Sequence, residues 1–379
     1  MKNILIYTVT AGNGHNTIAN TIKNSLKKEY GEEVNILVID FLKDYKTPVR
    51  AFIYDKAYRF VVKHCCMLYN FCFKMKLKSN PVSKNSLDIK ISLIGKYKKI
   101  MQTIKNFNPN YIFCSHFLPA IALSNLKKIK KIDIPFGSIV SDFVVCPFTE
   151  QAIYVDDIFL ASNNLVKNAL AVGFSNKQIK VLGFPSKLPK NEYVKNYFYS
   201  DKKLNIIIMS GSGNFKYLSK NIKNLFKEDM NIELTLISGN NKKDYLKNNK
   251  MMRNNKTNNM SVKCFGEVDF VNNYEHYKVF KNCDIIVTKC GANSLVEALN
   301  NSKIVISTNN LAQQEKENVK FFSNKIPLFL IDKNTTLVDI IKSNNFDKNF
   351  FEEYKKKINN LMQDGVDKKY AEYIYRSCK

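Results

Sequence analysis

Short apolar runs alternate with amphipathic segments along the first half of the chain. An apolar run at 4–9 is followed by a glycine-containing turn and then by Ile18, Ile22 and Leu26, whose four-residue spacing predicts a helix. Further strands are predicted at 34–39, 111–114, 136–140, 158–161 and 179–182. Because these runs are apolar almost throughout, they are typical of parallel strands that helices cover on both faces.

A second alternation begins after a break that contains Pro185 and Pro189, since proline interrupts regular pairing. It predicts strands at 205–209, 233–237, 262–265, 284–287 and 304–307, with helices at 218–226 and 294–300. The polar segment 242–259 is predicted to be a loop insertion. We therefore expect an α/β protein of two Rossmann-like doubly wound domains facing a cleft, 1–185 and 190–379, with the last helix a candidate to pack back on the N-terminal domain.

Composition adds a preference for anionic partners. The net charge of +26 suits nucleic acid, an acidic lipid surface or a phosphorylated substrate, although abundant Lys and Asn are also typical of AT-rich genomes. The nine cysteines form no CxxC pair, so a disulfide framework and a zinc site are not indicated, and a reducing cytoplasmic setting fits best. We find no signal peptide, and no uncharged apolar run approaches the ~20 residues of a membrane-spanning helix.

Two glycine-containing turns between a strand and a helix are the main candidates for chemistry. The first contains Gly12, Gly14 and His15, where glycines admit an anion to the helix N-terminus and a near-neutral imidazole can take a proton from a hydroxyl. The second runs over 288–294, where small residues leave the helix N-terminus open to a diphosphate. Glu297 shares a helix face with Ser294 and can accept hydrogen bonds from a ribose diol; the simpler interpretation is that it only supports the helix N-terminus.

Two weaker candidates lie in the second half. Gly211, Ser212 and Gly213 follow the strand at 205–209, where they form either another phosphate-facing turn or an ordinary connection. Gln314 and Glu315 lie in a polar run at 313–318, where their side chains suit sugar hydroxyls, although such a run is also typical of a solvated helix start.

These motifs, in this order and over residues 4–322, resemble the monogalactosyldiacylglycerol synthase and processive diacylglycerol glucosyltransferase family, which is related to the transferase that adds N-acetylglucosamine to lipid-linked muramyl pentapeptide. The first half matches at Gly12 to His15, at His116 and at Ser141-Asp142-Phe143. The second half matches at Lys289 to Ala298, with Cys290 in place of proline, and at Gln314, Glu315 and Asn318. The chain departs from the family after Asp142, where it reads Val-Val-Cys-Pro-Phe, and it has no tryptophan.

The resemblance implies a GT-B glycosyltransferase fold and a UDP-hexose donor. The residues implied to bind the donor are Gly14, Gly211, Ser212, Gly213, Gly291, Ala292, Asn293, Ser294, Glu297, Gln314 and Glu315. Transfer to a diacylglycerol or related lipid would invert the anomeric carbon, with His15 as the base and Asp142 as the alternative, and His116 would lie on the acceptor side. No cofactor and no metal are expected, since the chain has no Asp-x-Asp.

A basic and aromatic segment predicts contact with a membrane. Residues 43–105 hold 15 Lys or Arg against three acidic residues. Within 49–78, basic side chains share a helical face while aromatic residues crowd elsewhere, which is typical of a helix in an anionic interface or of a core helix with a basic solvent face. The basic residues are Arg50, Lys56, Arg59 and Lys63. We expect a cytoplasmic protein, peripheral on the inner face of the cell membrane.

Other functions remain open at this stage. The same fold could transfer N-acetylglucosamine to a polyprenyl-linked precursor or epimerise a UDP-sugar. A basic nucleic-acid-binding protein would explain the charge, but the chain lacks a recognised nucleic-acid motif, so no nucleic-acid partner is expected. A sugar-nucleotide sensor without catalysis is a third alternative.

Overall fold

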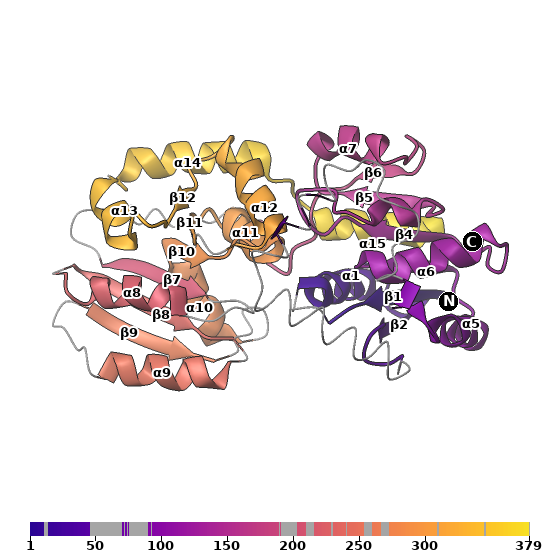
Figure 1. Cartoon of the computed structure of the whole chain (residues 1–379), viewed down its shortest axis with the longest axis horizontal. Coiled ribbons are helices and arrows are strands. Elements are labelled where there is room, and N and C mark those ends of the chain that lie inside the picture. Colours follow the sequence, from indigo (N-terminus) through magenta and orange to yellow (C-terminus); the bar gives the residue numbers. More distant parts are fainter. Residues whose placement is uncertain are drawn as a thin grey trace. The chain divides into compact units, whose positions relative to one another are not determined.

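The chain divides into two compact units, each built around one sheet (Figure 1). The computed structural model describes residues 1–10, 14–45, 70–71, 73, 75, 90–91, 93–188, 190, 203–209, 216–228, 230–239, 241–253, 260–266, 273–308, 311–344 and 346–378. The first unit comprises Met1–Ser186, Ala312–Gln314 and Gly365–Lys379, and the second comprises Lys187–Leu311 and Glu315–Asp364. The C-terminal segment therefore belongs to the same unit as the N-terminus.

The first sheet has six parallel strands in the order β2-β1-β3-β4-β5-β6. Their bounds are Lys2–Thr8 (β1), Val34–Asp40 (β2), Tyr111–Cys114 (β3), Phe136–Ile139 (β4), Asp157–Leu160 (β5) and Ile179–Val181 (β6). The predicted strands are confirmed with small shifts at their ends. Chain order reverses beside β1, with β2 on one side and β3 on the other, so the switch point lies at the carboxyl ends of β1 and β3.

The described part of the first unit also contains helices. They are α1 (Gly14–Tyr30), α5 (Lys96–Phe107), α6 (Phe117–Lys128), α7 (Val166–Ala171) and α15 (Val366–Ser377), with single 3-10 turns at Gly31–Glu33, Thr149–Ala152 and Asn163–Leu165. The predicted spacing in α1 is confirmed, because Ile18, Ile22 and Leu26 are all fully buried. This apolar stripe holds α1 in place and so positions the residues at its N-terminus.

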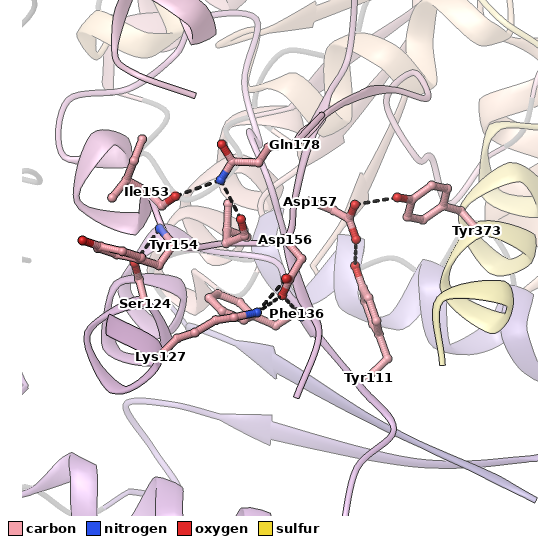
Figure 2. Close-up of polar contacts among 11 residues, drawn as sticks. Tyr111, Ser124, Lys127, Phe136, Ile153, Tyr154, Asp156, Asp157, Gln178 and Tyr373 are labelled. Carbon is pink, nitrogen blue, oxygen red and sulfur yellow. Dashed lines mark hydrogen bonds and ion pairs between the residues drawn. The ribbon is translucent and has the colours of Figure 1, made fainter. Parts of the chain in front are cut away.

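The C-terminal helix α15 is part of the first unit and packs against α1. Tyr373 on α15 and Tyr111 on β3 both donate hydrogen bonds to the carboxylate of Asp157 at the start of β5 (Figure 2). Gly137 on β4 makes room for the Tyr111 ring, because a Cβ atom there would overlap the Tyr111 hydroxyl and the Phe159 ring. A buried carboxylate thus joins the last helix to the first sheet.

The second sheet also has six parallel strands, in the order β12-β11-β10-β7-β8-β9. Their bounds are Leu204–Met209 (β7), Ile232–Ile237 (β8), Met260–Phe265 (β9), Ile285–Thr288 (β10), Ile304–Ser307 (β11) and Phe329–Leu330 (β12). Sequence reasoning missed β12, which is only two residues long. Here the order reverses between β7 and β10, so the second switch point lies at the carboxyl ends of those strands.

The helices of the second unit include several that the sequence did not predict. They are α8 (Lys216–Leu225), α9 (Lys242–Arg253), α10 (Tyr274–Asn282), α11 (Ala292–Asn300), α12 (Gln313–Ser323), α13 (Leu337–Ser343) and α14 (Lys348–Leu361). The prediction of a loop over 242–259 was wrong for 242–253. The Asn241 side chain accepts a hydrogen bond from the Asp244 N–H at the start of α9, and buried Asn248 donates one to the Ser238 hydroxyl. The cap and this buried polar contact stabilise a helix that has no apolar stripe.

Candidate functional site

At the first switch point, a polar network fixes the connection from β1 to α1. Thr10 donates to the carboxylate of Asp40 at the end of β2 and accepts from the Asn16 amide at 2.9 Å. The side-chain carbonyl oxygen of Asn16 accepts a hydrogen bond from the Thr8 hydroxyl at 2.8 Å. Asn16 is the third residue of α1, directly after His15, so this network anchors the backbone that carries the histidine.

His15 is hydrogen-bonded in a way that defines its tautomer. Its Nδ1 lies 2.8 Å from the carbonyl oxygen of Ser115, just beyond the end of β3. A carbonyl oxygen only accepts, so Nδ1 carries the proton and Nε2 of the neutral ring is left as an acceptor. Burial lowers the pKa of His15 below its usual 6.5, although the bond to Ser115 acts in the opposite direction. At neutral pH the ring is therefore uncharged and able to accept a proton.

His116 lies beside His15 with the opposite tautomer. It is the N-cap of α6, where its Nδ1 accepts from the Leu118 N–H at 3.0 Å, so its Nε2 is the donor in the neutral ring. The two imidazole rings meet edge to face with centroids 4.5 Å apart. Burial, and then the neighbouring His15, hold the pKa of His116 well below its usual value. The switch point thus brings together a hydrogen-bond acceptor and a hydrogen-bond donor.

Asp142, the alternative base, lies in the loop after β4. It is half-buried, and its negative charge adds to burial in raising the pKa of the Cys146 thiol. Cys146 belongs to the stretch that departs from the family pattern. Asp142 therefore acts electrostatically on the loop that departs from the family pattern. His15, in contrast, contacts the ring of His116.

At the second switch point, the turn after β10 leads directly into α11. Cys290 adopts a left-handed conformation with φ of 57°, and its carbonyl accepts from the side-chain amide of buried Asn318 on α12 at 3.3 Å. Gly291 is the N-cap of α11, and no heavy atom lies within 4 Å of where its Cβ would be. The space beside Gly291 at the N-terminus of α11 is therefore open, and an open helix N-terminus is the arrangement that binds phosphate.

Glu297 lies one turn farther along α11. Burial raises the pKa of its carboxyl group to about 7, and the positive charge of Lys187 acts in the opposite direction. Carboxylates with such a shift, next to an anion-binding turn, are typical of ligand sites. The structure thus places Gly291, Ala292, Asn293, Ser294 and Glu297 on one helix.

The polar run at 313–318 opens α12, as predicted. Gln314 and Glu315 lie in its first turn. Burial raises the pKa of the Cys290 thiol, and the negative charge of Glu315 raises it further.

Sequence reasoning missed Thr308, which lies just beyond β11. This residue is 4% exposed, and its N–H donates a hydrogen bond to the Thr288 carbonyl. Among the described residues, its hydroxyl has no hydrogen-bond partner. The only signal in the sequence is its place at a carboxyl strand end.

Several predicted residues lie outside the described residues. They are Gly12, Asn13, Gly211, Ser212, Gly213, Arg50, Lys56, Arg59 and Lys63. Of the first turn, Gly14 is described and begins α1. Within the described residues, no three His, Cys, Asp or Glu side chains gather as a metal site. No helix of that part of the chain combines the length and the apolar content needed to cross a membrane.

Two parallel sheets with these switch points define the GT-B fold of glycosyltransferases, and solved structures agree. MurG of Acinetobacter baumannii superimposes with a TM-score of 0.63 at 13% identity, covering 99% of this chain and 100% of MurG. Os79 from O. sativa in complex with UDP gives a TM-score of 0.59 at 13% identity, covering 99% of this chain and 100% of Os79.

Sequence comparison relates each half of the chain to a known family. Residues 15–185 match the family described as monogalactosyldiacylglycerol (MGDG) synthase, and residues 205–368 match the glycosyltransferase family 28 C-terminal domain. The first half of the chain is thus similar to the monogalactosyldiacylglycerol synthases, and the second half is similar to the C-terminal domain of family 28 glycosyltransferases.

Individual relatives come from plants and bacteria. The chloroplastic monogalactosyldiacylglycerol synthase of Spinacia oleracea is 25% identical over 335 residues, which cover 84% of this chain and 62% of the relative. The processive diacylglycerol beta-glucosyltransferase of Bacillus pumilus is 23% identical over 370 residues, which cover 95% of this chain and 91% of the relative. The chain thus spans about three fifths of the length of the plant relative and most of the bacterial one.

Proposed function

We propose that this protein is an inverting hexosyltransferase that moves a hexose from a UDP-sugar to diacylglycerol or a glycosyl-diacylglycerol. The observation that carries the proposal is the hydrogen bond from His15 Nδ1 to the Ser115 carbonyl, which leaves a neutral acceptor nitrogen at the first switch point. Two relatives, one named a monogalactosyldiacylglycerol synthase and the other a diacylglycerol glucosyltransferase, support the lipid acceptor.

In the proposed reaction, the lipid hydroxyl oxygen attacks the anomeric carbon while the bond from that carbon to the diphosphate oxygen breaks. The hydroxyl proton passes to Nε2 of His15, with Asp142 as the alternative base. The N-terminus of α11 stabilises the charge that develops on the leaving diphosphate. Inversion follows because a single displacement attacks from the face opposite the leaving group.

The donor would be held from the second switch point. Gly291, Ala292, Asn293 and Ser294 would contact the diphosphate, Glu297 the ribose, and Gln314 with Glu315 the sugar. Gly14 and the turn of Gly211, Ser212 and Gly213 would complete the phosphate contacts. No metal or cofactor is part of this proposal.

The acceptor would reach the protein from a membrane surface. Phe71 and Met75, four residues apart in a helical segment, are 63% and 56% exposed, whereas Phe73 between them is 9% exposed. Apolar side chains that remain exposed on one helical face can insert into a lipid interface, where each nearby basic residue adds ~1 kcal/mol of attraction. Arg50, Lys56, Arg59 and Lys63 would supply that attraction, with His116 facing the acceptor. We infer a cytoplasmic protein at the inner face of the cell membrane.

Replacing Phe71 and Met75 together by serine is expected to lower binding to vesicles of anionic lipid about tenfold or more, because ~0.8 kcal/mol is lost per CH₂ withdrawn from the lipid. Co-sedimentation with phosphatidylglycerol vesicles measures the effect. Tyr274→Ser is the matched control, since Tyr274 is a 74% exposed aromatic residue of the second unit. Equal losses in both variants would contradict a membrane-binding segment around residue 71.

Epimerisation of a UDP-sugar is the second candidate function. A UDP-GlcNAc 2-epimerase from Neisseria meningitidis has a similar fold and superimposes with a TM-score of 0.56 at 13% identity. Incubation of the protein with diacylglycerol vesicles and a panel of UDP-sugars, followed by mass spectrometry of the lipids, distinguishes the alternatives. We expect a hexosyl-diacylglycerol.

Other outcomes of that experiment would contradict the proposal. N-acetylglucosamine on a polyprenyl carrier, or an epimerised UDP-sugar without vesicles, would assign another reaction to the fold. Binding of a UDP-sugar without turnover would indicate a sensor. Salt-sensitive binding to an oligonucleotide with no sugar-nucleotide binding would indicate a nucleic-acid-binding protein.

A further inference from the structure

The first turn of α1 carries His15, and side chains from the ends of β1 and β2 hold it. The first fully buried side chain of α1 is that of Ile18, and residues 14–17 are only partly buried. The N–H groups in the first turn of a helix have no carbonyl partner within that helix, so helix ends fray readily. A side chain that fixes this turn therefore also fixes the position of His15.

Asn16 fixes the turn through a chain of hydrogen bonds that runs in one direction. The Asp40 carboxylate only accepts, so the Thr10 hydroxyl donates its proton there and accepts from the Asn16 amide nitrogen at 2.9 Å. The amide oxygen of Asn16 is thereby turned toward Thr8, whose hydroxyl donates to it at 2.8 Å. Asp40 is itself held, because its other carboxylate oxygen accepts two backbone N–H groups just beyond β2. The chain therefore ends on a fixed charge, and hydrogen bonds to a charged group are stronger than those between neutral groups.

The hydrogen-bond partner of His15 is held by the same strand. Ser115 donates its N–H to the carbonyl of Tyr7 at 2.9 Å, and its own carbonyl lies 2.8 Å from Nδ1 of His15. Tyr7 and Thr8 are consecutive residues of β1. Both partners of the His15–Ser115 hydrogen bond are therefore tied to the end of β1, His15 by way of Asn16 and Ser115 directly.

We propose that Asn16 is a positioning residue for the base, which acts with Thr10 to hold the His15 ring against the Ser115 carbonyl. This contact keeps the proton on Nδ1 and leaves Nε2 free to take the hydroxyl proton of the lipid. A ring that leaves the carbonyl can carry its proton on either nitrogen, and a ring with the proton on Nε2 cannot act as the base. The inference rests on the proposed function of His15, and Asn16 and Thr10 act through that residue and not on the substrate.

The test combines kinetics and spectroscopy on the full chain. The kcat of transfer is measured at saturating substrate, with diacylglycerol vesicles and the UDP-hexose that the panel experiment identifies. We expect Asn16→Ala to lower kcat about 10- to 100-fold, because a misplacement of about 1 Å can cost ~10²-fold. Thr10→Val keeps the shape of the side chain and should lower kcat in the same way, whereas Thr10→Ser keeps the hydroxyl and should restore it.

Nitrogen-15 NMR of the imidazole rings reports the tautomer directly. The chain has four histidines, and the spectrum of His15→Ala assigns the His15 signals. Near pH 8 the parent protein should show His15 with its proton on Nδ1, because the lowered pKa leaves the ring neutral there. Asn16→Ala and Thr10→Val should show a mixture of the two tautomers, and Thr10→Ser should match the parent protein.

Two controls separate positioning from a general effect on the fold. Asn248→Ala removes a comparable hydrogen bond, from a buried amide to the Ser238 hydroxyl at 3.0 Å in the second unit, and should change neither kcat nor the His15 tautomer. In a His15→Ala background, Asn16→Ala should lower kcat no further, because Asn16 acts through the missing ring.

The remaining outcomes contradict a specific step. If Asn16→Ala lowers kcat by the same factor with and without His15, or if kcat falls while the tautomer stays unchanged, the inference is wrong. If His15→Ala leaves kcat unchanged, the proposed base role itself fails. If His15→Ala lowers kcat but Asn16→Ala and Thr10→Val match the parent protein in kcat and tautomer, only the inference on Asn16 fails. Should Asn16→Ala not fold, the comparison of Thr10→Val with Thr10→Ser decides in the same terms.

Discussion

His15→Ala is expected to lower the kcat of hexose transfer about 10²- to 10⁴-fold, the range for loss of a general base. The reason is the geometry at the carboxyl ends of β1 and β3, where the Ser115 carbonyl holds the proton on Nδ1 and leaves Nε2 as the acceptor. Donor binding should change little, because the proposed donor contacts centre on the second sheet. Radiolabelled transfer from UDP-hexose to diacylglycerol vesicles measures kcat, and calorimetry with UDP measures donor binding.

The pH profile provides an independent check on this assignment. Because burial lowers the pKa of His15 below 6.5, kcat at saturating donor should fall only below that pH and remain level above it. His276→Ala on α10 is the matched control, since it removes a half-buried imidazole from the second unit, whereas His15 belongs to the first. Unchanged turnover in His15→Ala together with a large loss in Asp142→Asn would transfer the base role to Asp142.

The sequence predicted the sheets well because parallel strands are covered on both faces. Runs such as 111–114 consist of apolar residues that are all buried, so local composition alone marks them. The turn that leads into α11 was also predictable from local sequence, because its small residues lie between an apolar run and a helical pattern. These features depend on residues close together along the chain.

Other features depend on contacts between distant residues, which periodicity does not contain. Helix α9 has no apolar stripe, and its buried contact is Asn248 with Ser238. The carboxylate of Asp157 is hydrogen-bonded to Tyr373, 216 residues away in sequence. Likewise, His15 and His116 were predicted separately, and only the order of strands, with β3 next to β1, brings their rings together. Strand order is decided by packing of the whole unit.

Glu297→Gln is expected to weaken UDP-glucose binding about 10- to 100-fold near pH 8, because hydrogen bonds to a charged group contribute about 1.5–3 kcal/mol. The amide keeps the shape of the side chain but can accept fewer protons from the ribose. Calorimetry measures the loss. Glu275→Gln, on the exposed surface of α10, is the control and should bind the donor like the parent protein.

The same substitution should stabilise the unliganded protein, and the direction follows from the raised pKa of Glu297. Burial moves that pKa from 4.5 to about 7, so between these values the folded protein binds more protons than the unfolded chain. Stability therefore falls as the pH rises through this window and remains reduced above it.

Glu297→Gln removes the buried charge and should raise the free energy of unfolding by about 1–3 kcal/mol near pH 8, with no difference near pH 4. Thermal unfolding at both pH values measures this, and an equal effect at both would show that Glu297 is not ionised in the folded protein. A carboxylate retained at a cost to stability is the behaviour expected of a ligand-binding residue, since donor binding offsets the cost.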